Sequence, residues 1–118
     1  PMEPRSDFKG RREGILRFRE QSEAQQAELI AQNANYGEII CRCQMITKRE
    51  ILAAIENPLG VHTLSGIKYR AWSMTGRCQG GYCLPRIAEI LRREYGIEPE
   101  DMRCRDEGSY LFTGKVNP

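Results

Sequence analysis

Residues 76–96 read GRCQGGYCLPRIAEILRREYG, and this stretch decides the kind of fold to expect. Pro85 suits the first turn of a helix, and Gly96 suits the position just after the last turn. The apolar side chains between them recur every three or four residues, which is the spacing of one helix face: Leu84, Ile87, Ala88, Leu91 and Tyr95. The stretch therefore predicts an amphipathic helix over 84–95 that begins directly after a pair of cysteines.

Three more helices are expected before this one. Ser22 with Gln25, and Thr47 with Glu50, form capping-box patterns in which each side chain binds an otherwise unpaired backbone N–H. These patterns, and the apolar spacing that follows them, predict helices over 22–32, 48–56 and 64–74.

The remaining segments have weaker signals. β-Branched and aromatic residues favour a weak strand over 36–40, leading into Cys41, and a terminal strand over 109–113. A short turn of helix is expected over 99–102. The predicted fold is mostly α-helical: a small bundle of about four short helices, with irregular loops that carry the cysteines and one or two short terminal strands.

The length of 118 residues suits one domain. Residues 1–21 mix acidic and basic side chains without a clean period, which predicts a linker or docking arm before a domain over 22–118. The alternative is an ordered arm that wraps its own domain, with residues 14–18 as a short strand or buried plug. Because Pro1 precedes Met2, we expect a piece excised from a longer protein.

Composition excludes several classes of protein. With 40% hydrophobic and 29% charged residues, the chain is expected to be globular rather than disordered. Its longest apolar run is Ile51–Ile55, whereas a membrane span needs about 20 residues, so no span is expected. A net charge of +2 argues against a nucleic-acid partner. No secretory signal pattern is present, so a cytoplasmic location is expected.

Four cysteines form two closely spaced pairs. Cys41 and Cys43 have one residue between them, and Cys78 and Cys83 have four. Four thiolates can hold a two-iron iron–sulfur cluster or a structural zinc ion. The Cys-x-Cys spacing is unusual for zinc and favours the cluster, but zinc and unligated or disulfide-bonded cysteines stay open as alternatives.

The residues around these cysteines suit an anionic centre. Gly80 and Gly81 let the backbone approach closely, so that N–H groups can point at sulfur. Arg42 and Arg77 add positive charge, as does the start of the 84–95 helix. We therefore expect these four residues to surround the site and tune it.

Other reactive or aromatic residues have ordinary explanations. Cys104 is expected to be a partly buried free thiol, and His62 a loop or packing residue. Tyr69 and Trp72 are expected to pack in the core. No acid–base pair or catalytic triad is evident, so no catalytic residue is assigned.

The cysteine pattern resembles that of the bacterioferritin-associated-ferredoxin-like (BFD-like) [2Fe-2S] binding domains. The gaps of one, 34 and four residues between Cys41, Cys43, Cys78 and Cys83 match that family's pattern. The stretches YGEIICRCQMITKREI, HTLSGIKYR and GRCQGGYCLPRIAEIL also resemble the C-terminal domain of FAD-dependent, anaerobic-type glycerol-3-phosphate dehydrogenases. The arm KGRREGILRF resembles the segment that joins this domain to the flavin domain, so the likeness runs from about 8 to 115.

The resemblance implies a helical fold around a [2Fe-2S] cluster held by these four cysteines, with electron transfer beside a flavin. It implies FAD in the parent protein, but the chain has no Gly-x-Gly-x-x-Gly fingerprint, so FAD is expected to bind elsewhere. The expected partners are the flavin-binding catalytic domain of the parent chain and a second subunit or electron acceptor. The chain alone is not expected to be an enzyme.

Two other functions stay open. A structural zinc in the four-cysteine site would supply folding energy to a module that docks domains or subunits; zinc could also replace iron in protein handled in air. An exposed and labile site would suit iron or sulfur delivery.

Overall fold

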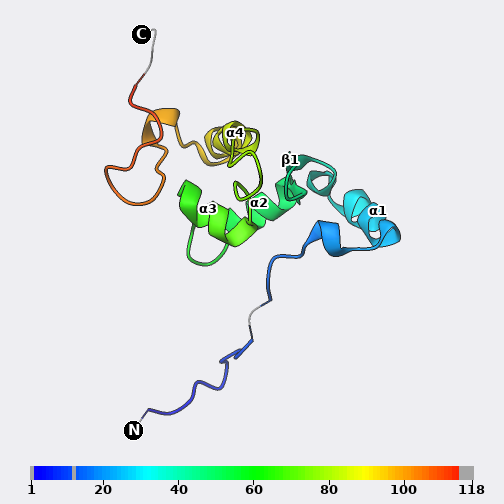
Figure 1. Cartoon of the computed structure of the whole chain (residues 1–118). Coiled ribbons are helices and arrows are strands. Elements are labelled where there is room, and N and C mark those ends of the chain that lie inside the picture. Colours follow the sequence, from blue (N-terminus) through cyan, green and yellow to red (C-terminus); the bar gives the residue numbers. More distant parts are fainter. Residues whose placement is uncertain (1, 12, 115–118) are drawn as a thin grey trace.

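The computed structural model describes residues 2–11 and 13–114 (Figure 1). The regular elements within this part of the chain are mostly helical, which confirms the predicted fold class. The α-helices are α1 (Glu23–Gln32), α2 (Lys48–Ile55), α3 (Leu64–Ala71) and α4 (Cys83–Tyr95). Strands β1 (Ile39–Cys41) and β2 (Ile46–Thr47) pair antiparallel, and single 3-10 turns lie at η1 (Phe18–Glu20), η2 (Ala34–Tyr36) and η3 (Pro99–Asp101).

The helix boundaries follow from local capping chemistry. Ser22 and Thr47 each accept a hydrogen bond from the third residue of the following helix, whose side chain accepts one in return, so both predicted capping boxes are confirmed. Farther along the chain, α4 stops at Gly96, which has a φ of 65°. Glycine adopts that left-handed backbone without steric cost, which explains why the helix ends there.

Helix α3 is shorter than predicted. It ends at Ala71 rather than near residue 74, because Trp72 takes a left-handed conformation with a φ of 64°. Met74 does the same at 59°. Two such residues turn the chain sharply and bury Ser73 and Met74, so the segment predicted as the last helical turn instead opens the loop that carries Cys78.

The core lies between α2, α3, α4 and the β-hairpin (Figure 1). Helices α2 and α3 pack side by side, and α4 contacts β1. The most buried side chains of the core are aliphatic and include Ile46, Ile51, Ile67, Ile87 and Leu91, each with no exposed surface. Burying each of them contributes roughly 1.5–3 kcal/mol, so this small group accounts for much of the fold's cohesion.

The predicted terminal strand over 109–113 is wrong. The structure has one isolated antiparallel bridge there, between Arg103 and Tyr110, and Leu111 N donates to the carbonyl of Met102 at 2.8 Å. The chain reverses through Gly108, with a φ of 85°, and most residues beyond it are exposed. With so little apolar surface to bury, the pairing does not propagate into a strand.

The N-terminal segment has two parts. Described residues before Gly14 run exposed and away from the helical body (Figure 1). Ile15 packs against the core and Phe18 is buried. Both observations agree with the alternative in which residues 14–18 supply a buried plug. The boundary between arm and domain at 21/22 stays a prediction. The predicted arm and the family likeness also include some of the residues 1, 12 and 115–118, which lie outside the described residues.

The helices of the described residues include none that is long and apolar enough to cross a membrane.

Candidate four-cysteine site

The two predicted cysteine pairs come together between the hairpin and the start of α4. Cys41 is the last residue of β1, and Cys83 is the first residue of α4. Cys43 lies in the turn 42–45 between the strands, which we call the first cysteine loop. Cys78 lies in the segment 72–82 between α3 and α4, which we call the second cysteine loop. All four thiols are free.

The thiols are grouped two by two, with one member of each group from each half of the motif. Cys43 Sγ and Cys78 Sγ are 3.5 Å apart and both residues are exposed. Cys41 and Cys83, with 1% and 0% of their surface exposed, are hydrogen-bonded to each other in the interior. Among residues 2–11 and 13–114, no three His, Cys, Asp or Glu side chains are close enough to hold a single metal ion together.

Backbone N–H groups point at two of the sulfur atoms. Those of Tyr82 and Gly80 donate to Cys78, and the Tyr82 hydrogen bond is the main reason that the pKa of the Cys78 thiol is lowered. Cys83 also accepts one, from Met74, but burial and then the nearby Cys41 raise its pKa to about 11. Cys78 is thus placed where a thiolate is stabilised, and Cys83 where an uncompensated negative charge is costly.

The predicted glycines let the second cysteine loop close tightly. Gly80 has a φ of 94° and a Cβ there would lie 3.3 Å from Cγ of Met74. A Cβ on Gly81 would lie 3.2 Å from the carbonyl oxygen of Cys78. Gly80 is favoured by its left-handed backbone, and at both positions a Cβ would make a contact tighter than usual.

Gly76 is a site residue that the sequence reasoning missed. A Cβ at this position would overlap the Cβ of Cys43 and lie 3.1 Å from its Sγ. The first cysteine loop therefore packs directly on the backbone of the second one at Gly76. The only signal was a glycine two residues before Cys78, which the sequence alone explains equally well as the end of a helix.

Strained backbone is concentrated around the site. Within the described residues, the non-glycine positions with positive φ are Met45, Trp72, Met74 and Gln79, and all lie in the two cysteine loops. Each such conformation costs of order 1 kcal/mol and persists only where the surroundings impose it. The strain supports a functional rather than merely connecting role for these loops.

The prediction that Tyr69 and Trp72 pack in the core is wrong. Their side chains are 68% and 59% exposed. The early end of α3 explains why Trp72 is exposed. The left-handed turn carries this residue out of the helical register that predicted its burial. Tyr69 lies on the outer face of the same helix.

The predicted arginines lie at the outer side of the site. The guanidinium of Arg42 stacks on the Tyr82 ring at 4.4 Å, and that of Arg86 lies 4.7 Å from the same ring. Arg77, next to Cys78 in the chain, is exposed. The cation–π contacts hold positive charge beside the loop that donates two N–H groups to Cys78.

One buried hydroxyl in the second cysteine loop has no protein partner. Ser73 has no exposed surface, and its Oγ makes no hydrogen bond within the described residues. It directly precedes Met74, whose N–H donates to Cys83. A buried hydroxyl without a partner costs about 1–3 kcal/mol, so its presence fits a site where a bound group offers an acceptor.

Cys104 and His62, the two remaining residues considered in the sequence analysis, have the ordinary packing roles expected of them. Cys104 is half-buried, and its backbone N–H donates to the Ser109 carbonyl at 2.7 Å, which agrees with the expectation of a partly buried free thiol. The His62 ring packs on the Tyr95 ring with 5.7 Å between centroids, as expected of a packing residue.

Comparisons with known proteins show which sequences this chain is similar to. The model of the BFD-like [2Fe-2S] binding domain matches residues 39–93. A glycerol 3-phosphate dehydrogenase of Caloramator mitchellensis is 42% identical over 113 residues, which are 96% of this chain and 24% of that protein. The hydrogen cyanide synthase subunit HcnB of Pseudomonas aeruginosa is 36% identical over 80% of this chain and 20% of its own length. A subunit of the anaerobic glycerol-3-phosphate dehydrogenase of Escherichia coli K12 is 36% identical over 47% of this chain and 10% of its own length.

The chain thus spans about a quarter of the length of the first of these relatives. No solved structure matches it.

Proposed function

Because residues 39–93 belong to the family of BFD-like [2Fe-2S] binding domains, we propose that Cys41, Cys43, Cys78 and Cys83 bind a [2Fe-2S] cluster. When bound, such a cluster accepts and donates single electrons. The proposed role of this chain is electron transfer within a larger oxidoreductase.

The observation that carries the proposal is the grouping of the four thiols. Four cysteines from two distant parts of the sequence meet as an exposed pair and a buried pair. A two-iron cluster needs four thiolates spread over two metal ions, whereas one zinc ion needs all four around a single point. The two-by-two arrangement supports the first requirement better than the second.

The surrounding residues have a consistent proposed role. The N–H groups of Gly80 and Tyr82 that donate to Cys78 stabilise negative charge on sulfur. Arg42 and Arg77 supply positive charge at the exposed side, and the first turn of α4 adds its N-terminal dipole. Gly80 and Gly81 are proposed to act through close backbone approach.

The relatives support a partnership with a catalytic domain. Two are named as glycerol-3-phosphate dehydrogenases, one as part of a hydrogen cyanide synthase and one, from Rhizobium meliloti, as part of an opine oxidase. Such different names suggest that substrate choice resides outside the shared module. We propose a parent protein of the glycerol-3-phosphate dehydrogenase type whose FAD-binding domain passes electrons to this domain in the cytoplasm, and from there to a second subunit or acceptor.

The decisive experiment is elemental. Iron, acid-labile sulfide and zinc should be measured on the 118-residue chain purified without oxygen, together with its visible spectrum. Two irons and two sulfides per chain, with bands that dithionite bleaches, are expected. Cys78→Ser should remove these signals, while Cys104→Ser, which changes a thiol outside the two pairs, should keep them.

The alternative is a structural zinc module that docks domains or subunits. One zinc per chain, no sulfide and no reducible band would overturn the electron-transfer proposal in favour of this alternative. Zinc found only in protein prepared in air would instead reflect replacement of iron.

A further inference from the structure

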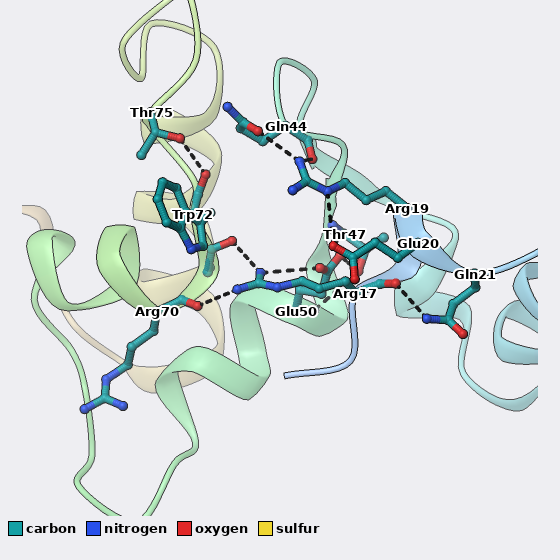
Figure 2. A network of polar contacts seen from close by, with 11 residues as sticks. Arg17, Arg19, Glu20, Gln21, Gln44, Thr47, Glu50, Arg70, Trp72 and Thr75 are labelled. Carbon is teal, nitrogen blue, oxygen red and sulfur yellow. Dashed lines mark hydrogen bonds and ion pairs between the residues drawn. The ribbon is translucent and has the colours of Figure 1, made fainter. Parts of the chain in front are cut away.

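We propose that residues 15–21 form a strap that holds the two cysteine loops together, with Arg17 and Arg19 as positioning residues for Cys43 and Cys78. The part of this inference that concerns a cluster rests on the function proposed above. The strap itself is argued from contacts within the chain (Figure 2).

Arg17 fastens the strap to the end of α3, directly before the second cysteine loop. Its guanidinium donates to the carbonyl of Ala71 at 2.7 Å and to that of Arg70 at 3.0 Å. These are carbonyls at the end of α3, where helices leave acceptors unpaired and where a cation is favoured by the helix dipole. The next residue, Trp72, begins the left-handed turn toward Cys78.

The same guanidinium also contacts the start of α2, which holds the strand that follows the first cysteine loop. Arg17 Nη1 lies 3.6 Å from Oε1 of Glu50, a carboxylate that is almost fully buried. The other oxygen, Oε2, accepts from the N–H and the hydroxyl of Thr47, the residue that closes strand β2. Figure 2 shows the resulting chain of contacts from Thr47 through Glu50 and Arg17 to the end of α3.

Arg19 fastens the strap to the first cysteine loop from outside. Its Nη1 donates to the backbone carbonyl of Gln44 at 3.3 Å and to the Gln44 side-chain oxygen at 3.0 Å. Gln44 directly follows Cys43. Arg17 therefore binds directly before the second cysteine loop and Arg19 binds within the first, and these are the loops whose exposed sulfur atoms are 3.5 Å apart.

The residue between the two arginines anchors the strap. Phe18 is 9% exposed, and its ring stacks on Tyr36 with 6.1 Å between centroids. Gln21 Nε2 donates to the Arg17 carbonyl and Gln26 Nε2 donates to that of Phe18, both at 3.0 Å. A strap fixed at its centre can transmit restraint to the loops at both arginines.

The consequence is that the distance between Cys43 and Cys78 depends on a segment outside the 39–93 region that matches the family. With the strap in place, the two thiols are held near contact. Without it, each loop keeps its own turn, but the loops can move relative to each other.

The test uses the metal-free, reduced 118-residue chain, where no cluster is needed. Glutathione disulfide oxidises the Cys43 and Cys78 thiols to one disulfide and yields two molecules of glutathione. The ratio of disulfide to dithiol at equilibrium in glutathione buffers gives the effective concentration of one thiol at the other. Mass spectrometry shows which two cysteines the bond joins. Arg19→Ala should lower that concentration roughly fivefold, the equivalent of one net hydrogen bond.

Arg17 needs a gentler substitution, because an alanine would leave the Glu50 carboxylate buried without a cation. Arg17→Lys keeps the charge but cannot donate to two carbonyls at once in the same geometry, so a similar roughly fivefold fall is expected. Arg5→Ala is the matched control, since within the described part of the chain the Arg5 side chain pairs with exposed Asp7 of the same arm, and the substitution should leave the value unchanged. Equal values in wild type, Arg19→Ala and Arg17→Lys would overturn the strap.

A second measurement separates the strap from the proposed cluster. In protein that carries a cluster, the rate at which a chelator removes iron should rise in Arg19→Ala and not in Arg5→Ala, and the visible circular dichroism should change. An unaltered rate and spectrum would refute the link to the cluster even if the disulfide equilibrium shifts. If wild type binds no cluster, the proposed function fails while the disulfide result still decides the strap.

Discussion

Cys43 and Cys78 are separated by 34 residues of sequence, and yet their sulfur atoms are 3.5 Å apart. Neither loop could bring this about alone. The hairpin presents Cys43, the early end of α3 presents Cys78, and the packing of α2 on α3 places the two loops in contact. The exposed half of the site is thus a product of tertiary structure.

The two thiol pairs should differ in reactivity. In the metal-free, reduced chain at about pH 8, iodoacetamide should modify Cys43 and Cys78 roughly tenfold or more faster than Cys41 and Cys83, because the latter have at most 1% of their surface exposed. Peptide mass spectrometry over a time course checks the order. Equal rates for all four thiols would show that the buried pair is not protected.

A loaded site should protect the exposed pair as well. In protein carrying a cluster, modification of Cys43 and Cys78 should slow markedly, while that of Cys104 should not change. Cys104 is the internal control because it is half-buried and lies outside both pairs. Unchanged reactivity of Cys43 and Cys78 in loaded protein would argue against their role as ligands.

Gly76→Ala should disrupt the site more than the fold. The new methyl group would overlap the Cβ of Cys43, so one cysteine loop must move away from the other. We expect iron content to fall by most of its wild-type value and stability to fall by about 1–3 kcal/mol, as for overpacking. Gly14→Ala is the control, because a Cβ there meets nothing within 4 Å. Full iron content in the Gly76 variant would mean that the loops do not need this contact.

Tyr95 gives a prediction about pH. Its hydroxyl donates to Oε1 of Glu56 at 3.1 Å, and burial, followed by that carboxylate, raises its pKa to about 12. The folded state therefore holds the phenol proton more tightly than the unfolded chain does. This contribution is complete below pH 10, the ordinary pKa, and is lost as the pH rises toward 12.

Tyr95→Phe removes that titration. At pH 7 the substitution should cost about 1 kcal/mol of unfolding free energy, the net value of a hydrogen bond. As the pH rises above 10, the deficit relative to wild type should shrink, because only wild type loses the contribution. Urea unfolding at pH 7, 9 and 11 measures the free energy of unfolding of both proteins. A difference between them that stays constant across the series would be inconsistent with the raised pKa.

The helices and the cysteine pattern could be predicted from sequence because their signals are local. Ser22 and Thr47 carry their capping partners three residues away, and Gly96 ends α4 by its own conformational freedom. The convergence of the cysteine pairs was predictable from the pattern and the family likeness rather than from local propensity. That these cysteines are ligands stays a proposal.

The features that sequence did not reveal depend on contacts between distant residues. The helical period continues through Trp72, and nothing local shows that it turns left-handed there. The need for glycine at residue 76 arises from Cys43, and the role of Arg17 arises from carbonyls more than 50 residues away. The terminal strand was wrong because β-propensity at 109–113 had no long partner to pair with.

Ser73 offers the sharpest test of what the site binds, because its substitution has different effects in the two forms of the protein. In the metal-free chain its buried hydroxyl has no partner among the described residues, and Ser73→Ala, which replaces the hydroxyl with hydrogen, removes that cost. Ser73→Ala should therefore stabilise the metal-free fold by about 1 kcal/mol. Urea unfolding checks this, with Ser109→Ala as the control that removes a hydroxyl already bonded to Asp106 and Arg105 and should destabilise.

In protein that carries a cluster, the same hydroxyl would lie next to Met74, whose N–H donates to Cys83, and it could itself donate to sulfur. Hydrogen bonds to sulfur favour the more negative, reduced state of an iron–sulfur centre. Ser73→Ala should then lower the reduction potential, and Ser73→Thr, which keeps the hydroxyl, should shift it less if it folds. A potential that does not move in Ser73→Ala, in protein with full iron content, would mean that the orphaned hydroxyl does not face the cluster.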